Sequence, residues 1–222
     1  MPTIAIVGAG PGLGASIAKT FGGHGFQVAL IARSKDKLEA LAAELGESGI
    51  SAAGFPADVS DRLALSTALG NAAAQFGTID VLEFSPYGGL VPVYPQEMTV
   101  DNLRPQIEES LYGAVTAVNA VLPAMIEAGT GTLLFTTGGG AINPYPMLAT
   151  TNAAHAALRN WVFNLNGVLA DKGIHAANVA INVFIGAQPP SEGIPYAAPD
   201  DLAQIYWNLH VDRDQAEVVV TG

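Results

Sequence analysis

Short apolar runs alternate with amphipathic stretches along nearly the whole chain, and this alternation limits the fold more than any other feature. Strands are expected at Thr3–Val7, Gln27–Ala32, Ile50–Phe55, Ile79–Phe84, Gly131–Thr136 and Ala177–Phe184. Helices are expected at Gly12–His24, Lys35–Glu47, Asp61–Gln75, Val100–Glu127, Leu148–Asp171 and Asp200–Val211, before a last short strand at Glu217–Val220. Strands joined through helices are parallel and buried on both faces. The pattern therefore predicts an α/β fold with a doubly wound parallel sheet.

The length and composition favour one compact domain. The chain has 222 residues, half of them apolar and 13% charged, which is enough for a substantial core. No internal repeat or low-complexity linker divides it, and the Pro- and Gly-rich stretch 186–199 is expected to be a loop. We therefore expect a single Rossmann-type domain over residues 1–222.

The charge balance and the missing cysteines exclude several classes of partner and site. Nine basic against twenty acidic residues give a formal net charge of −11, which repels nucleic acid. No apolar stretch is long enough to span a membrane without polar residues or proline, so no membrane association is expected. The absence of cysteine removes disulfides and thiolate sites, and no spacing of His, Asp and Glu predicts a metal site. With a strand pattern from Thr3, no signal peptide is expected, and we expect a cytoplasmic protein.

A glycine-rich turn follows the first expected strand and opens the first expected helix. Its glycines include Gly8, Gly12 and Gly14, with Leu13 between the last two. Glycine is needed where the backbone turns sharply and where a side chain would block a pyrophosphate, and amides at the helix start face the anion. In this strand–turn–helix context the turn predicts a dinucleotide site. Residues 1–100 are then the dinucleotide-binding half and 101–222 the catalytic and substrate half.

The spacing of these glycines resembles that of the short-chain dehydrogenase/reductase family, and further pieces follow in the family's order. Ala57-Asp58-Val59 matches the pair whose carboxylate meets the adenine amino group, so Asp58 and Val59 are expected at the cofactor. Further matches are Asp80-Val81-Leu82, Leu122-Pro123-Ala124-Met125 and Gly173-Ile174. Gly186 corresponds to a glycine that borders the nicotinamide in the family. Together these pieces cover nearly the whole chain.

The charge after the second expected strand indicates which cofactor is preferred. Arg33 and Lys35 stand where a carboxylate would be needed to hold the ribose hydroxyls of NAD(H). A basic side chain there attracts a 2′-phosphate instead. We therefore expect NADP(H), with NAD(H) as the alternative.

The family's catalytic set is a serine, a Tyr-x-x-x-Lys pair and an asparagine, and the resemblance places other residues at all four positions. Counting back from Gly173 puts the lysine position at His155 and the tyrosine position at Thr151. Counting from the fifth strand puts the serine position at Gly138, thirteen residues before Thr151. The asparagine position falls on Ser110. These residues lack the usual phenol and the fixed positive charge.

An alternative register places the pair at Leu148 and Asn152, and it also lacks tyrosine and lysine. In the preferred register, a threonine hydroxyl is too weakly acidic to replace a phenol. His155 can act as a general acid or base, or only bind the ribose. Tyr145, on the loop before this helix, is the candidate for a displaced phenolic acid. The catalytic candidates are therefore His155, Thr151, Tyr145 and Ser110.

Three functions remain open. The first is an NADP(H)-dependent oxidoreductase acting on a small carbonyl or alcohol, the second a non-redox enzyme such as an isomerase, cyclase or lyase, and the third a catalytically silent NADP(H)-binding module. The helices containing Ala114–Ala120 and Ala153–Ala157 are rich in small residues, and by resemblance they predict a homodimer or homotetramer. Three histidines are expected to be structural, with His175 exposed, His24 at a helix end and His210 in a core or interface.

Overall fold

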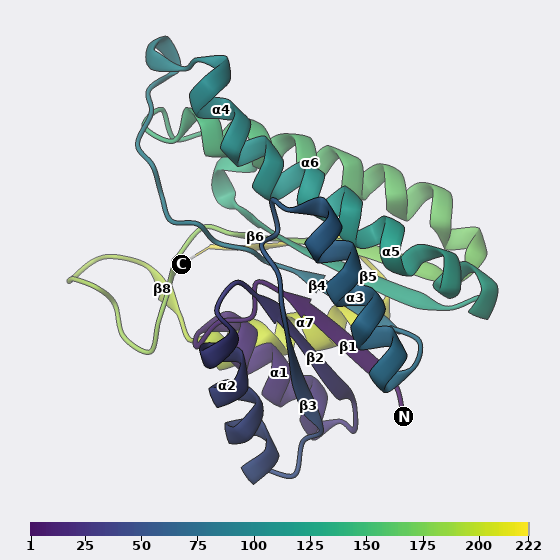
Figure 1. Cartoon of the computed structure of the whole chain (residues 1–222). Coiled ribbons are helices and arrows are strands. Elements are labelled where there is room, and N and C mark those ends of the chain that lie inside the picture. Colours follow the sequence, from purple (N-terminus) through teal and green to yellow (C-terminus); the bar gives the residue numbers. More distant parts are fainter. Residues whose placement is uncertain (222) are drawn as a thin grey trace.

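One seven-stranded parallel sheet organises the protein, whose computed structural model describes residues 1–221 (Figure 1). Its order is β3-β2-β1-β4-β5-β6-β9. The strands are β1 (Thr3–Val7), β2 (Gln27–Ala32), β3 (Ala52–Pro56), β4 (Val81–Phe84), β5 (Gly131–Gly138), β6 (Ile174–Ile181) and β9 (Glu217–Val220). The strand order reverses between β1 and β4: strands β2 and β3 are added on one side of β1, and β4 and the later strands on the other. Doubly wound folds bind ligands at this point, at the carboxyl ends of the strands. The expected single-domain, doubly wound α/β fold is confirmed.

Two layers of helices cover the sheet, and each layer has its own apolar core. The helices are α1 (Leu13–Gly23), α2 (Lys35–Glu47), α3 (Arg62–Phe76), α4 (Val100–Ile107), α5 (Gly113–Ala128), α6 (Ala149–Leu169) and α7 (Pro199–Asp212). Short turns are η1 (Pro95–Glu97), the π-helical η2 (Glu108–Tyr112), η3 (Gly139–Ala141) and η4 (Ala170–Lys172). Helices α3, α5 and α6 pack on one face, and α1, α2 and α7 on the other (Figure 1). Since both faces are buried, the strands carry nearly continuous apolar runs.

Most expected elements agree with the structure to within two residues at each end, and two differ more. Strand β6 begins at Ile174 and ends at Ile181, so the expected range Ala177–Phe184 was shifted by three residues. The helix expected at Val100–Glu127 is continuous but contains the π-helical turn η2, which joins α4 to α5. Helical periodicity does not show such a turn, because it inserts only one residue into the pattern.

One helical segment, Val100–Ala128, has the length and composition of a membrane span, with a mean hydropathy of 1.4 over its most apolar window. A third of that window is buried inside the protein. Its inward face, which includes Ala114, Val118 and Met125, belongs to the core below the sheet. The segment is therefore placed as a core helix of the α/β fold.

A small flap leaves the sheet after β6. It contains the two-stranded parallel ladder of β7 (Phe184–Ile185) and β8 (Tyr196–Ala197), and it projects beyond the carboxyl edge of the sheet in Figure 1. Gly186 lies in this flap, where its N–H donates to the carbonyl of Ala197. Because β6 ends at Ile181, Asn182 directly follows this strand, and Gly186 lies beyond β7.

Candidate cofactor and active site

The turn after β1 can be built only with glycine at its first position. Gly8 has a φ of +104°, and a Cβ there would lie 2.5 Å from the carbonyl oxygen of Ser85. That carbonyl is close because β4 lies beside β1, where the Ser85 N–H donates to Val7 at 2.8 Å. Gly14 is also confined, since its Cβ would lie 3.0 Å from the Cα of Ala9. The close packing of the turn thus explains two of the three glycines.

The third glycine, Gly12, faces open space and caps helix α1. A Cβ on it would meet nothing within 4 Å. No side chain caps the helix, and its first turn carries no acidic residue. The first amides of a helix have no acceptor within it, so those of Leu13 and Gly14 are available to an anion. This cradle of Gly8, Gly12, Leu13 and Gly14 has the free amides and the space that could hold the pyrophosphate of a dinucleotide.

Charged side chains gather where the adenosine half of such a ligand would lie. Arg33 follows β2 and is exposed, and Asp58 follows β3 and accepts a hydrogen bond from the Ser60 N–H at 2.9 Å. Val59 packs against Gly113 of α5, because a Cβ on Gly113 would lie only 2.6 Å from Cγ2 of Val59. Glu109, in η2, is a residue that the sequence comparison missed. The pKa of Glu109 is raised, chiefly by burial and further by the charge of Asp58, although the charge of Arg33 lowers it.

His155 lies beneath the end of β5 and is held as a neutral imidazole. The N–H of Gly138 donates to its Nδ1 at 2.9 Å. Because Nδ1 accepts this bond, the ring proton is on Nε2. Burial lowers the pKa of His155 to about 4, so the ring is uncharged at pH 7. The side chain therefore offers one N–H donor and no positive charge.

Thr151 and Ser110 are enclosed between α6 and the α4–α5 helix. Thr151 is 9% exposed, and its hydroxyl donates to Oε1 of Gln106 at 3.0 Å. Ser110 is 6% exposed and lies in the π-helical turn η2. Such turns occur often at functional sites, because they redirect side chains that a regular helix would place elsewhere. Helix α6, which carries Thr151 and His155, thus packs against the π-helical turn that carries Ser110.

The alternative register would use Leu148 and Asn152, and both have structural roles here. Leu148 is the residue before the first turn of α6. The Asn152 amide donates to the carbonyl of Tyr145 at 2.7 Å. Its Oδ1 lies so close to Gly140 that a Cβ there could not fit. Asn152 therefore fixes the loop that carries Tyr145.

Tyr145 is the phenol that reaches the end of β6. Its hydroxyl donates to Oδ1 of Asn182 at 2.9 Å, and 48% of the residue is exposed. Asn182 lies close to Gly139, where a Cβ would be 2.5 Å from the Asn182 side chain. The phenol is thus placed at the carboxyl edge of the sheet, between the ends of β5 and β6.

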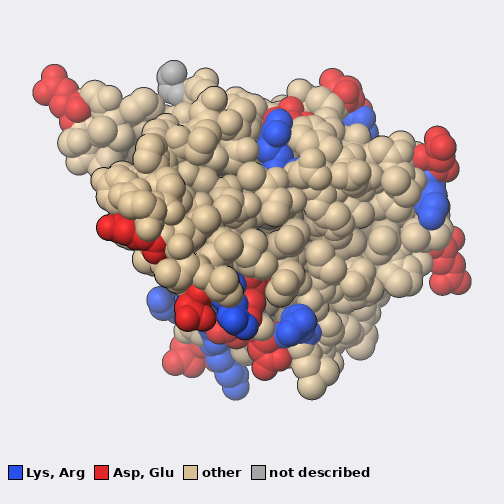
Figure 2. All heavy atoms as spheres, turned by 90° about the horizontal axis from the view of Figure 1, so that it is seen from above, with Lys and Arg blue, Asp and Glu red and all other residues tan. Residues whose placement is uncertain are grey.

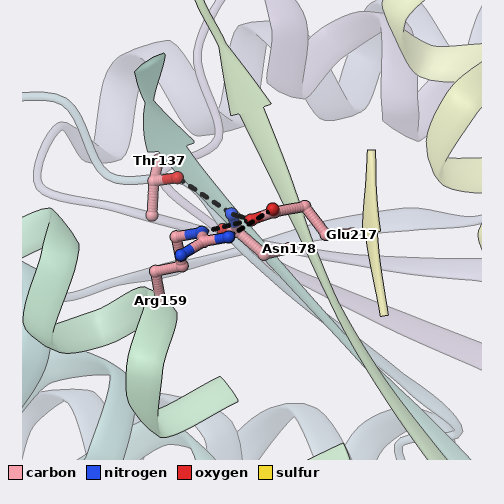
Figure 3. Close-up of polar contacts among 4 residues, drawn as sticks. All are labelled: Thr137, Arg159, Asn178 and Glu217. Carbon is pink, nitrogen blue, oxygen red and sulfur yellow. Dashed lines mark hydrogen bonds and ion pairs between the residues drawn. The ribbon is translucent and has the colours of Figure 1, made fainter. Parts of the chain in front are cut away.

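Four polar side chains, those of Thr137, Arg159, Asn178 and Glu217, form a hydrogen-bonded network (Figure 3). Arg159, one turn after His155, donates to both oxygens of Glu217, at 2.6 and 2.7 Å. The Asn178 amide donates to Glu217 at 2.9 Å and to the Thr137 hydroxyl at 3.0 Å. Burial alone would raise the pKa of Glu217, but the hydrogen bonds from Arg159 and Asn178 outweigh it and lower that pKa. The network ties β9 to α6 and to the residue preceding Gly138.

Glu83 is a buried carboxyl that the sequence analysis did not single out. It is fully buried in β4, where Ser85 donates to Oε2 at 3.0 Å and Thr136 to Oε1 at 3.2 Å. Thr136 also shares a 2.6 Å hydrogen bond with the buried hydroxyl of Tyr206. Burial raises the pKa of Glu83 to about 8, and the two hydrogen bonds only partly oppose this. The carboxyl is therefore mostly neutral at pH 7, next to the strand end that contacts Gly8.

The other histidines lie at the amino edge of the sheet, away from the glycine turn. His175 is only 7% exposed, so its expected exposure was wrong, because β6 is an inner strand covered on both sides. His210 lies 2.9 Å from the Thr132 hydroxyl, and burial lowers its pKa to about 4. His24 caps the end of α1 and stacks on Trp207 at 3.7 Å. No group of three or more His, Cys, Asp or Glu residues suits a metal ion among residues 1–221.

Known proteins resemble the chain in sequence and in fold. It is 31% identical over 170 residues to D-threitol dehydrogenase of Mycolicibacterium smegmatis, covering 74% of the chain and 62% of the relative. It is 29% identical over 174 residues to inactive hydroxysteroid dehydrogenase-like protein 1 of Pongo abelii, covering 76% of the chain and 52% of the relative. The chain thus spans less than two thirds of the length of these two relatives.

Among solved structures, L-sorbose reductase of Gluconobacter frateurii, complexed with NADPH and L-sorbose, superimposes with a TM-score of 0.90 at 20% identity. The match covers 100% of this chain and 95% of that one. A model of the short chain dehydrogenase family matches residues 2–185. Because that match spans most of the sequence, the chain belongs to the short-chain dehydrogenase family.

Proposed function

We propose that the protein is an NADP(H)-dependent oxidoreductase that interconverts a small carbonyl compound and its alcohol with a non-standard active site. Family membership supports this reaction class, and the cradle of Gly8, Gly12, Leu13 and Gly14 supports dinucleotide binding. Arg33 supports NADP(H) over NAD(H), because its guanidinium can hold a 2′-phosphate. L-Sorbose reductase, of nearly the same fold, is a relative crystallised with NADPH. Asp58 and Val59 would border the adenine.

The bound cofactor would supply the hydride, and the chain's own residues must supply a proton and orient the carbonyl. We assign orientation to His155, whose Nε2–H is directed by the hydrogen bond at Nδ1. A neutral imidazole can polarise a carbonyl oxygen as a hydrogen-bond donor. We assign the proton to Tyr145, whose hydroxyl is exposed at the strand ends. Thr151 and Ser110 would shape the site, and Asn182 would take the place expected for Gly186.

The observation that carries this proposal is the His155 hydrogen bond, since it leaves a donor where the family places a lysine. The test follows NADPH absorbance during incubation with a panel of aldehydes and ketones. The wild-type protein should consume NADPH, and His155→Gln and Tyr145→Phe should each lower kcat by about 100-fold, the scale of acid–base and donor contributions. Their dissociation constants for NADPH should stay close to the wild-type value. Full activity in both variants would refute the assignment.

A second candidate function is that of a catalytically silent NADP(H)-binding protein. It is favoured because the polar side chains on α6 already have hydrogen-bond partners or carry no charge. Thr151 already donates to Gln106, and His155 carries no charge. This function predicts that NADPH raises the melting temperature, while no carbonyl or alcohol in the panel changes NADPH or NADP⁺ absorbance. Turnover of any member of the panel would exclude it.

We also propose that the protein is a cytoplasmic homodimer or homotetramer that pairs through α5 and α6. Figure 2 shows a wide area without charged side chains in the middle of the face over α4–α6. Exposed apolar residues of these helices include Ile126 of α5 and Phe163 and Val168 of α6. In the small-residue stretches Ala114–Ala120 and Ala153–Ala157 of these two helices, part of each stretch faces the core, but Ala120, Ala153 and Ala156 are exposed and allow close approach. Sedimentation of wild type and of Phe163→Glu would test this, since the variant should be monomeric.

A further inference from the structure

Three segments follow β4, β5 and β6 at the carboxyl edge of the sheet (Figure 1), and the second of them carries Tyr145. They are residues 85–98 after β4, 139–148 after β5 and 182–198 after β6. The first two are joined at Val93, which donates to the Met147 carbonyl at 2.8 Å and accepts from Ala149 at 3.0 Å. The second and third are joined by the hydrogen bond between Tyr145 and Asn182. These hydrogen bonds join the three segments into one surface around Tyr145, and a substrate at its hydroxyl would lie on that surface.

The three segments are rich in apolar and aromatic residues and carry no basic ones. They contain no lysine, arginine or histidine, and their only charged residues are Glu97 and Glu192. Large apolar and aromatic side chains are exposed on all three. They are Tyr87, Leu90, Val91, Tyr94, Met98, Tyr145, Met147, Phe184, Ile194 and Tyr196, each at least 41% exposed.

This pattern selects against anions and favours apolar groups. A carboxylate, phosphate or sulfonate that leaves water needs a cation or several donors to offset its lost hydration. The three segments offer no cation, and the net charge of −11 repels anions at long range. Aromatic and aliphatic side chains instead gain free energy by covering apolar surface of a ligand. Arg33 is reserved for the cofactor side, across the sheet beside β2.

We propose that the substrate is an uncharged carbonyl compound or alcohol with an aromatic or bulky apolar substituent, bound on this surface. This inference rests on the proposed function for the reaction and adds the chemical class of the molecule. It excludes keto acids, acyl thioesters of phosphate-bearing carriers and sulfonated aldehydes as substrates, since each presents an anion to the surface.

The test uses three probes with the same keto group. Ethyl benzoylformate carries a phenyl ring and no charge, benzoylformate has the ring and a carboxylate, and ethyl pyruvate has neither ring nor charge. Binding to the full chain in the presence of NADP⁺ is measured by saturation-transfer NMR, which needs no turnover. Ethyl benzoylformate should bind at least about tenfold more tightly than either other probe, because each lacks one favoured feature. Equal or tighter binding of benzoylformate, or no binding of ethyl benzoylformate, would overturn the proposal.

A variant that introduces a positive charge sharpens the result. Met147→Lys places a cation on the surface and should raise the affinity for benzoylformate several-fold, as expected for a new charge-assisted contact. The control is Val211→Lys, which adds the same charge at an exposed apolar residue at the end of α7. It should leave the affinity for all three probes unchanged. Equal effects of the two variants would contradict the location, and so would a change of oligomeric state in Met147→Lys alone, since that would assign the surface to a second copy.

The outcomes separate the two proposals. If ethyl benzoylformate binds selectively while no probe consumes NADPH, the oxidoreductase proposal fails and the ligand class stands. If NADPH is consumed at similar rates with ester and acid, the reaction class stands and the ligand class fails.

Discussion

The buried carboxyl of Glu83 gives the protein an unusual dependence of stability on pH. The unfolded chain releases this proton near the ordinary value of 4.5, whereas the folded protein holds it until about pH 8. Between these values the unfolded state binds fewer protons, so the free energy of unfolding falls as pH rises from about 4.5 to 8. Each tenfold change in proton affinity is worth about 1.4 kcal/mol, which gives a loss of about 5 kcal/mol at pH 8 and above.

Replacing Glu83 by glutamine removes the titration and keeps the shape of the side chain. The amide can still pair with the hydroxyls of Ser85 and Thr136, because both can rotate to donate or accept. Glu83→Gln should therefore match the wild type near pH 4.5 and exceed its free energy of unfolding by up to about 5 kcal/mol at pH 8.5.

The assay is urea unfolding followed by circular dichroism, at intervals from pH 4.5 to 9. The other titrating groups are common to both proteins, so the difference between the two curves reports Glu83 alone. Glu127→Gln, at an exposed position on α5, is the control and should show no pH-dependent difference. A difference between Glu83→Gln and the wild type that stays constant across this range would refute the reasoning.

Three further predictions concern other parts of the structure. Arg159→Met should destabilise the fold by about 3 kcal/mol in urea, because it leaves the largely buried Glu217 carboxylate without its positively charged partner, and adding Glu217→Gln should recover part of the loss. His210 binds a proton in the unfolded chain near pH 6.5 but in the folded protein only near 4, so the melting temperature should fall as pH drops from 6.5 to 4, less steeply in His210→Gln. Gly138→Ser should unfold at a urea concentration close to that of the wild type, since its Cβ would lie at an ordinary 3.5 Å from His155 Nδ1; a large loss would contradict the packing at β5.

The fold followed from the sequence because its signals are local and repeated. Alternating apolar runs and helical periodicity predict the crossover units, and Lys35–Glu47 even matches its helix at both ends. The predicted ends of helices and strands were wrong where tertiary contacts determine them. Strand β6 begins at Ile174 because pairing with Gly131 of β5 starts there, and the run of small residues after it carries no strand pattern of its own.

The site was less accessible from the sequence. The glycine turn could be predicted from the sequence, because only glycine fits at position 8, where β1 and β4 lie close together. The protonation state of His155 could not be predicted, since it depends on an amide of strand β5, which packs against its helix. Glu83 did carry a signal, as a single acidic residue within the apolar run Val81–Phe84. Tyr206, which shares the Thr136 hydroxyl with Glu83, comes from a helix more than a hundred residues away, so the network could not be inferred from spacing.

The central claim is that the glycine turn and Arg33 hold NADP(H), and calorimetric titration of both cofactors tests it most directly. NADPH should bind at least about tenfold more tightly than NADH, the scale of a charge-assisted contact to the 2′-phosphate. In Arg33→Ala that preference should disappear, through weaker binding of NADPH with little change for NADH. Equal affinities in the wild type, or a preference for NADPH that survives in Arg33→Ala, would contradict the account.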